Sequence, residues 1–146
     1  MRRHKSLLVM AAVTAAMLMP TAHADDADVI KYRKHIMTSL SAQAAMLGQI
    51  VSYAIPNDNV VAHLDAVALL ASTALKAYEP KVLGGEAKPE VWANWPDFSK
   101  RMKEFADKAA AAAKTAHTTG PEAALANMLD VLSCKSCHDA YRAEKK

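Results

Sequence analysis

Apolar residues recur along this chain at alternating steps of three and four, which is the spacing of one face of an α-helix. The longest such stripe stops before Pro56, and its members are Ile30, Arg33, Met37, Leu40, Ala44, Leu47, Val51 and Ala54. Three further segments with this spacing begin near residues 57, 96 and 121 and end near 79, 119 and 142. No stretch shows the alternation of a strand, and short connections make neighbouring helices antiparallel. The sequence therefore predicts an all-α, antiparallel up-down-up-down four-helix bundle.

Residues 1–24 have the features of a cleaved secretory signal peptide. A basic start, Met1–Lys5, is followed by an apolar run from Leu7 to Met19 and by an A-x-A cleavage site that ends at Ala24. The apolar run is too short to span a bilayer, so no stable membrane anchor is expected after cleavage. The predicted mature chain, residues 25–146, is a single periplasmic domain.

The charge balance argues against nucleic acid as a partner. The chain has 18 lysines and arginines against 15 acidic residues. Three of the basic residues lie in the leader, so the mature chain is close to neutral and lacks the basic excess of nucleic-acid-binding proteins.

The sequence Cys134-Lys-Ser-Cys137-His138 stands close to the end of the chain. C-x-x-C-H is the attachment signature of c-type haem, in which two thiols bind the haem covalently and the histidine ligates the iron. A disulfide between residues three apart would close a very small loop, a redox C-x-x-C would need a βαβ unit, and zinc would need two further ligands. Together with the export signal, the motif predicts one haem c, held by Cys134 and Cys137 and ligated by His138.

The residue on the other side of the iron, at its second axial position, must come from earlier in the sequence than the C-x-x-C-H motif. His138 lies near the end of the fourth predicted helix, level with the start of the first and the third. His63 and His117 are excluded because they lie at the opposite end of the bundle. Met128 is excluded because it is on the same helix as His138, and His35 because it is on an outward face. Met37 and Met102 remain as residues at the right level, although either could be an ordinary core methionine.

Two arginines are further candidates for the haem site. Arg33 interrupts an apolar stripe, so it needs a partner, and a haem propionate would supply a bidentate one. Its alternative role is a side chain that reaches water at the end of the bundle. Arg142, four residues after His138, is expected to approach His138 or a propionate, or to complement the C-terminal end of its helix.

Over residues 26–146 the chain resembles the class II cytochromes c, meaning cytochrome c′ and its low-spin, methionine-ligated relatives. The resemblance rests on four features: the C-x-x-C-H motif, residues 32–37, residues 91–98 and the basic Arg142. It implies a periplasmic four-helix bundle, often a homodimer, with one covalent haem c. It also implies that the position four residues after the helix-one arginine covers the open face of the iron, which favours Met37 over Met102. A glutamine that often contacts a propionate in this family is replaced by Lys34.

Two functions follow from this resemblance, and the first is preferred here. In the first, Met37 is the sixth ligand opposite His138, and the protein carries single electrons between redox partner proteins. In the second, Met37 only covers a five-coordinate iron, which binds nitric oxide or another small diatomic gas. A remote third possibility is a haem-free exported helical protein that binds metal through its thiols. An enzyme is not expected, because no distal acid–base pair lies at the level of the iron.

Overall fold

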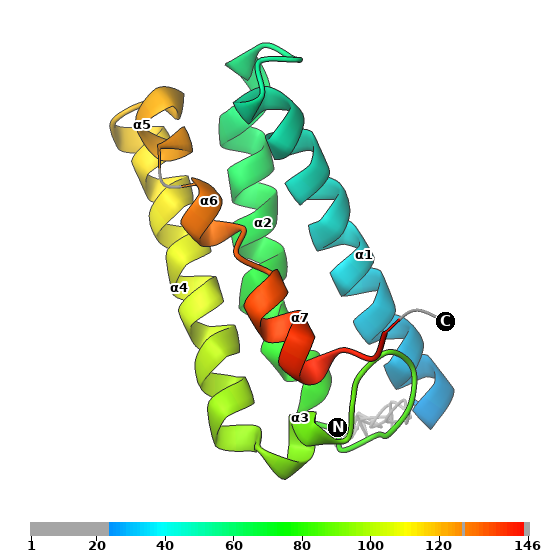
Figure 1. Cartoon of the computed structure of the whole chain (residues 1–146). Coiled ribbons are helices and arrows are strands. Elements are labelled where there is room, and N and C mark those ends of the chain that lie inside the picture. Colours follow the sequence, from blue (N-terminus) through cyan, green and yellow to red (C-terminus); the bar gives the residue numbers. More distant parts are fainter. Residues whose placement is uncertain (1–23, 127, 145–146) are drawn as a thin grey trace, which may run out of the picture.

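The computed structural model describes residues 24–126 and 128–144, so the predicted signal peptide lies outside the described residues except for Ala24. Three long helices, α1 (Asp26–Val51), α2 (Val60–Ala74) and α4 (Trp95–Thr118), run antiparallel to their neighbours (Figure 1). A fourth leg returns along them as α5 (Pro121–Leu125), α6 (Met128–Val131) and α7 (Lys135–Tyr141). Within the described residues there is no strand, only isolated bridges at Gly84–Ala87 and Ala87–Arg142. The predicted all-α four-helix bundle is confirmed.

The ends of α1 follow from local chemistry. The carboxylate of Asp25 accepts a hydrogen bond from the Asp28 amide at 2.8 Å, and acidic residues fill the first turn, where the helix dipole favours negative charge. The helix ends at Val51, three residues before the predicted end of the stripe. Tyr53 then takes a left-handed conformation, with φ at 59°, and turns the chain toward Pro56.

α2 is extended at both ends by 3₁₀ turns, η1 (Asn57–Asn59) and η2 (Leu75–Tyr78). By length and composition alone, Asn57–Tyr78 is the one segment of the described chain that could cross a membrane. A helix that packs between two others in a protein core passes the same test. One face of α2 is buried against α1 and α4 through Val60, Leu64, Val67, Ala71 and Ala74.

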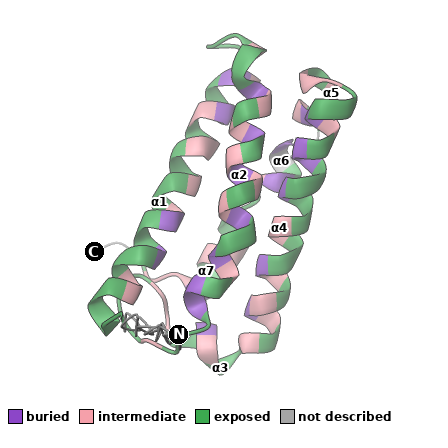
Figure 2. Ribbon diagram, turned by 180° about the vertical axis from the view of Figure 1, so that it is seen from behind, coloured by how far each residue is buried: buried purple, intermediate pink, exposed green. Residues whose placement is uncertain are grey.

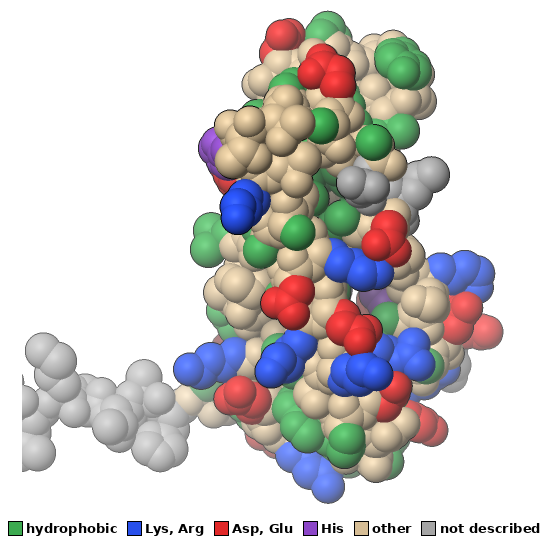
Figure 3. Space-filling view, turned by 90° about the vertical axis from the view of Figure 1, so that its left-hand side faces the viewer, with side chains coloured by type: hydrophobic (Ala, Val, Ile, Leu, Met, Phe, Trp, Pro, Cys, Tyr) green, Lys and Arg blue, Asp and Glu red, His purple; other side chains and the backbone are tan. Residues whose placement is uncertain are grey.

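The connection between α2 and α4 contains the short helical turn α3 (Glu90–Ala93). α4 begins at Trp95, with Pro96 in its first turn, where a missing backbone N–H costs little. Outside the bundle core, lysine and arginine side chains are interleaved with aspartate and glutamate over the α4 side of the molecule (Figure 3). The ion pairs include Lys100–Glu104 and Lys108–Asp130.

The prediction of one continuous helix from Pro121 to about Arg142 is wrong. The helix is interrupted before the C-x-x-C-H motif, between α6 and α7. There the Ser133 hydroxyl donates to the carbonyl of Asp130, and the Cys134 amide donates to the carbonyl of Leu132 at 2.7 Å. Serine offers the backbone such local hydrogen bonds in place of helical ones, and this competition does not appear in the apolar periodicity.

Buried residues recur along each of the long helices (Figure 2). They form two apolar clusters that fill the bundle. One lies toward α5 and α6 and includes Leu47, Leu64 and Met128. The other, which we name the lower cluster, lies near α3 and α7; its buried members are Ile36, Ala74, Ala77, Tyr78, Val91, Phe98, Met102 and Tyr141. Ile36 and Ile50 are buried, whereas Met37 is only half-buried, so the inward face of α1 is turned slightly from the predicted stripe.

Candidate functional site

The C-x-x-C-H motif occupies a single helical turn at the start of α7. The His138 amide donates to the carbonyl of Cys134 at 3.1 Å, the i to i−4 bond of an α-helix. At 100° per residue, Cys134, Cys137 and His138 therefore lie within about 100° of one another around the helix. Neither thiol is in a disulfide; Cys134 is exposed and Cys137 is half-buried, and partial desolvation raises the pKa of both, which keeps them in the protonated form.

His138 is half-buried and borders an open cavity of about 460 Å³, which is also lined by Lys88, Asp139, Arg142, Ala143 and Glu144. Burial, and secondly the charge of Arg142, lower the pKa of His138. The neutral imidazole, with a free lone pair, is the form that ligates a metal. Two protonated thiols and a neutral imidazole on one turn fit the attachment of haem c.

Met37 and Cys137, from the first and last legs of the bundle, both pack against the lower cluster. Met102 is a buried member of the same cluster, so the structure brings both methionine candidates to the α7 end of the bundle. The rejected residues are elsewhere: His35 is exposed, Met128 belongs to the other cluster, and His63 and His117 pair with Gln43 and Asp65. Among the described residues no group of three or more His, Cys, Asp or Glu could hold a metal ion by itself.

Arg33 is 3% exposed and has protein partners. Its guanidinium donates to the carbonyl of Val82 at 2.9 Å and, more weakly, to that of Gly84 at 3.5 Å. It also lies over the rings of Tyr78 and Trp92, 5.3 and 5.1 Å from their centroids. Carbonyl oxygens and two aromatic faces can stabilise a buried cation without a propionate.

Arg142 forms an ion pair that the sequence did not indicate. Its Nε lies 2.7 Å from Oε2 of Glu86, which belongs to the loop between α2 and α3. The Arg142 amide also donates to the carbonyl of His138 at 2.9 Å, so the arginine follows His138 by one turn. Arg142 is therefore placed beside His138 by both its own helix and the loop.

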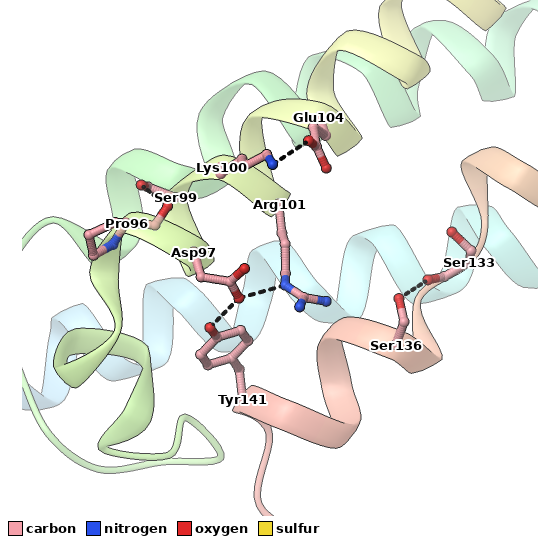
Figure 4. A network of polar contacts seen from close by, with 9 residues as sticks. All are labelled: Pro96, Asp97, Ser99, Lys100, Arg101, Glu104, Ser133, Ser136 and Tyr141. Carbon is pink, nitrogen blue, oxygen red and sulfur yellow. Dashed lines mark hydrogen bonds and ion pairs between the residues drawn. The ribbon is translucent and has the colours of Figure 1, made fainter.

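A polar network fixes α7 to the first turn of α4 (Figure 4). Oδ2 of Asp97 accepts hydrogen bonds from the Tyr141 hydroxyl at 2.5 Å and from Nε of Arg101 at 2.7 Å. The Tyr141 ring also packs edge-on against Phe98, with centroids 5.2 Å apart. The two hydrogen bonds lower the pKa of Asp97, with the larger effect from Tyr141. The Tyr141 hydrogen bond also raises the pKa of Tyr141 itself.

Replacing Tyr141 with phenylalanine is expected to lower the Tm by about 2–5 °C at pH 7. Because the pKa of Asp97 is lowered by folding, its ionised form stabilises the protein above about pH 4, and this contribution is lost as the pH falls further. The raised pKa of Tyr141 keeps its hydroxyl a donor up to at least about pH 10. The deficit of Tyr141→Phe should therefore shrink near pH 3.

Thermal unfolding followed by circular dichroism at both pH values measures this difference. Tyr53→Phe, at a tyrosine that is 95% exposed, is the matched control and should leave the Tm unchanged. A deficit of equal size at pH 3 and pH 7 would show that the Asp97 carboxylate plays no part.

Glu86, Asp97 and Arg101 are site residues that the sequence analysis missed. Asp97 contacts Tyr141 across 44 residues of chain and Glu86 contacts Arg142 across 56, whereas Arg101 joins the site through Asp97. Charged residues in a helix's first turn or in a loop are common, so one sequence carries no signal that singles these out.

The chain is similar to known cytochromes c′. The family model for cytochrome c′ matches residues 28–142. Cytochrome c′ of Alcaligenes xylosoxydans xylosoxydans is 29% identical over 81% of this chain and 95% of the relative. The protein of Rubrivivax gelatinosus is 31% identical over 79% and 94%.

Solved structures of the Alcaligenes protein have the same fold. Its ferrous arginine-to-lysine variant with bound nitric oxide matches with a TM-score of 0.77 and 28% identity, over 85% of this chain and all of that one. The nitric oxide complex of a leucine-to-valine variant matches with a TM-score of 0.76 and 28% identity, over 84% of this chain and all of that one. Proteins of this family carry one covalently attached haem c. On the match of its sequence, its bundle and its C-x-x-C-H turn, this chain belongs to the cytochrome c′ family and is a monohaem c-type cytochrome.

Proposed function

We propose that this protein binds a small diatomic gas, such as nitric oxide, at a five-coordinate haem c. The observation that carries the proposal is the match to cytochrome c′ structures that hold nitric oxide. This reverses the preference that the sequence alone gave to a methionine-ligated electron carrier, because the matches favour the alternative.

The C-x-x-C-H turn would hold the haem on α7. Cys134 and Cys137 would form the two thioether bonds, and the neutral His138 would ligate the iron from one side. When bound, the haem supplies an iron whose open coordination position accepts a diatomic ligand. Arg142 and Arg33 are proposed at the haem edge, where Arg33 has N–H donors beyond the two given to carbonyls.

Met37 is proposed to cover the open face of the iron without ligating it. It lies on α1 at the border of the lower cluster, which also contains Ile36 and is bordered by Leu40. Apolar side chains at this position give a ligand few polar partners, and they favour small uncharged molecules over water or anions.

Electron transfer with Met37 as the sixth ligand is the second candidate. The thioether is half-buried at the same cluster as Cys137, and a methionine sulfur is competent to bind haem iron. For either function we propose a periplasmic location after cleavage behind Ala24. The apolar leader with its A-x-A site and a haem type attached to exported proteins support this location.

The test uses the purified mature protein. We expect an intact mass that starts at Asp25 and includes one haem, and oxidised and reduced visible spectra of a high-spin haem. Nitric oxide and carbon monoxide should each change the spectrum of the reduced protein when about one equivalent of gas is added per haem. A low-spin spectrum that neither gas perturbs would contradict gas binding and support the electron carrier, and a retained leader would contradict the cleavage site.

A further inference from the structure

The loop of residues 79–89 ties α1 to the end of α7 (Figure 1). On the α1 side it is held by the hydrogen bonds that Arg33 donates to the carbonyls of Val82 and Gly84. Gly84 and Gly85 have positive φ values, and an added Cβ at either would lie 3.0 or 2.9 Å from the Ile30 side chain. The loop is therefore closely fitted to α1.

On the α7 side the same loop pairs with the backbone after His138. The Lys88 amide donates to the carbonyl of Tyr141 at 2.9 Å, and the Ala143 amide donates to the carbonyl of Glu86 at 2.8 Å. The Lys88 ammonium donates to the carbonyl of Asp139 at 2.9 Å. Because these contacts use backbone oxygens, the position of the Glu86 backbone does not depend on its carboxylate.

This arrangement gives His138 charged neighbours of both signs. Arg142 and Asp139 line the same cavity as His138, and Glu86 is bound to Arg142, so all three charges lie around the imidazole. Arg142 and Glu86 are bound to each other at 2.7 Å, with side chains 36% and 50% exposed. An ion pair this exposed contributes little to folding stability. Its more important effect is therefore the electrostatic one on His138.

We propose that Glu86 is a positioning residue that fixes the Arg142 guanidinium beside His138 and offsets its charge, so that this ion pair sets the reduction potential of the haem. The inference rests on the haem ligation proposed for His138 and applies to a gas-binding protein and to an electron carrier alike. One-electron reduction removes a positive charge from the iron, and a nearby cation favours the reduced form whereas a nearby anion favours the oxidised form. The ion pair changes only the fraction of haem that is reduced at a given potential, and the proposal includes no transfer of a chemical group.

The experiment is a spectroelectrochemical titration of the haem-loaded protein and three variants at about 0.1 M salt, where exposed charges are only partly screened. Glu86→Gln leaves Arg142 without its carboxylate and should raise the midpoint potential. Arg142→Gln should lower it. We expect each single variant to change the ferrous-to-ferric ratio at a fixed potential by roughly threefold or more, and the double variant to return close to the wild type.

Asp130→Asn is the matched control, because it removes one carboxylate from the Lys108 ion pair, which lines a different cavity from the one that His138 borders. Its potential should stay at that of the wild type. A loss of packing would move both single variants in the same direction, and that result would overturn the proposal. So would a Glu86→Gln shift no larger than that of the control. Failure of the haem ligation itself would be seen separately, as a wild-type spectrum without histidine coordination.

Discussion

Replacing His138 with alanine is expected to remove the protein ligand from one face of the haem iron while the haem stays covalently bound. The two thioether bonds come from Cys134 and Cys137, which this change leaves intact, so the colour should remain with the denatured polypeptide. The visible spectrum should lose histidine coordination completely, because among the described residues no other histidine lies on the same turn of α7. Imidazole added at millimolar concentration should restore it.

His35→Ala is the matched control for this prediction. His35 is exposed on α1, two residues from Met37, and the variant should have the wild-type spectrum. An unchanged spectrum in His138→Ala, or a loss of coordination in His35→Ala instead, would contradict the assignment of the proximal ligand.

Replacing Met37 with alanine is expected to open the distal side without changing the spin state. Shortening a side chain that borders the lower cluster removes the apolar cover, so carbon monoxide should bind the reduced protein about tenfold faster or more, which corresponds to a barrier lower by about 1.4 kcal/mol. The cost to stability should stay below the 2–5 kcal/mol or so typical of fully buried methionines, because Met37 is only half-buried. Flash photolysis and visible spectra measure the two effects.

Met102→Ala is the control that distinguishes a residue covering the iron from an ordinary core methionine. Met102 is 6% exposed in the same cluster, so its removal should cost about 2–5 kcal/mol of stability and leave the rate of carbon monoxide binding nearly unchanged. A change from low-spin to high-spin in Met37→Ala would instead show that Met37 ligates the iron, as the electron-carrier function requires. A faster rate only in Met102→Ala would assign the distal position to Met102.

The helical content and the order of the legs were predictable from the sequence. The apolar spacing identified the three long helices, which the structure places at Asp26–Val51, Val60–Ala74 and Trp95–Thr118. The fourth leg was predicted as one helix, but it is broken before Cys134. Apolar periodicity cannot detect this break, because it arises from hydrogen bonds of Ser133 and of the Cys134 amide.

The partners of the two arginines could not be predicted. The stripe showed that Arg33 needs a partner, but its carbonyl acceptors lie 49 and 51 residues away in a loop. Arg142 was expected near His138, and its ion pair with Glu86 depends on how that loop folds back over the end of α7. Such contacts are made between segments that no local pattern relates.

By itself, the sequence determined that the chain is helical, that it has the signature for one haem c and that His138 is the proximal candidate, because these depend on local spacing: 3.6 residues per helical turn, and two thiols and an imidazole within one turn. Only the tertiary structure decided what surrounds that turn. It placed Met37 and Met102 at one cluster with Cys137, fixed α7 to α4 through Asp97, and set Glu86 against Arg142. The physical reason is that charges and packed side chains act through space, and their distances are set by the packing of the legs and not by separation along the chain.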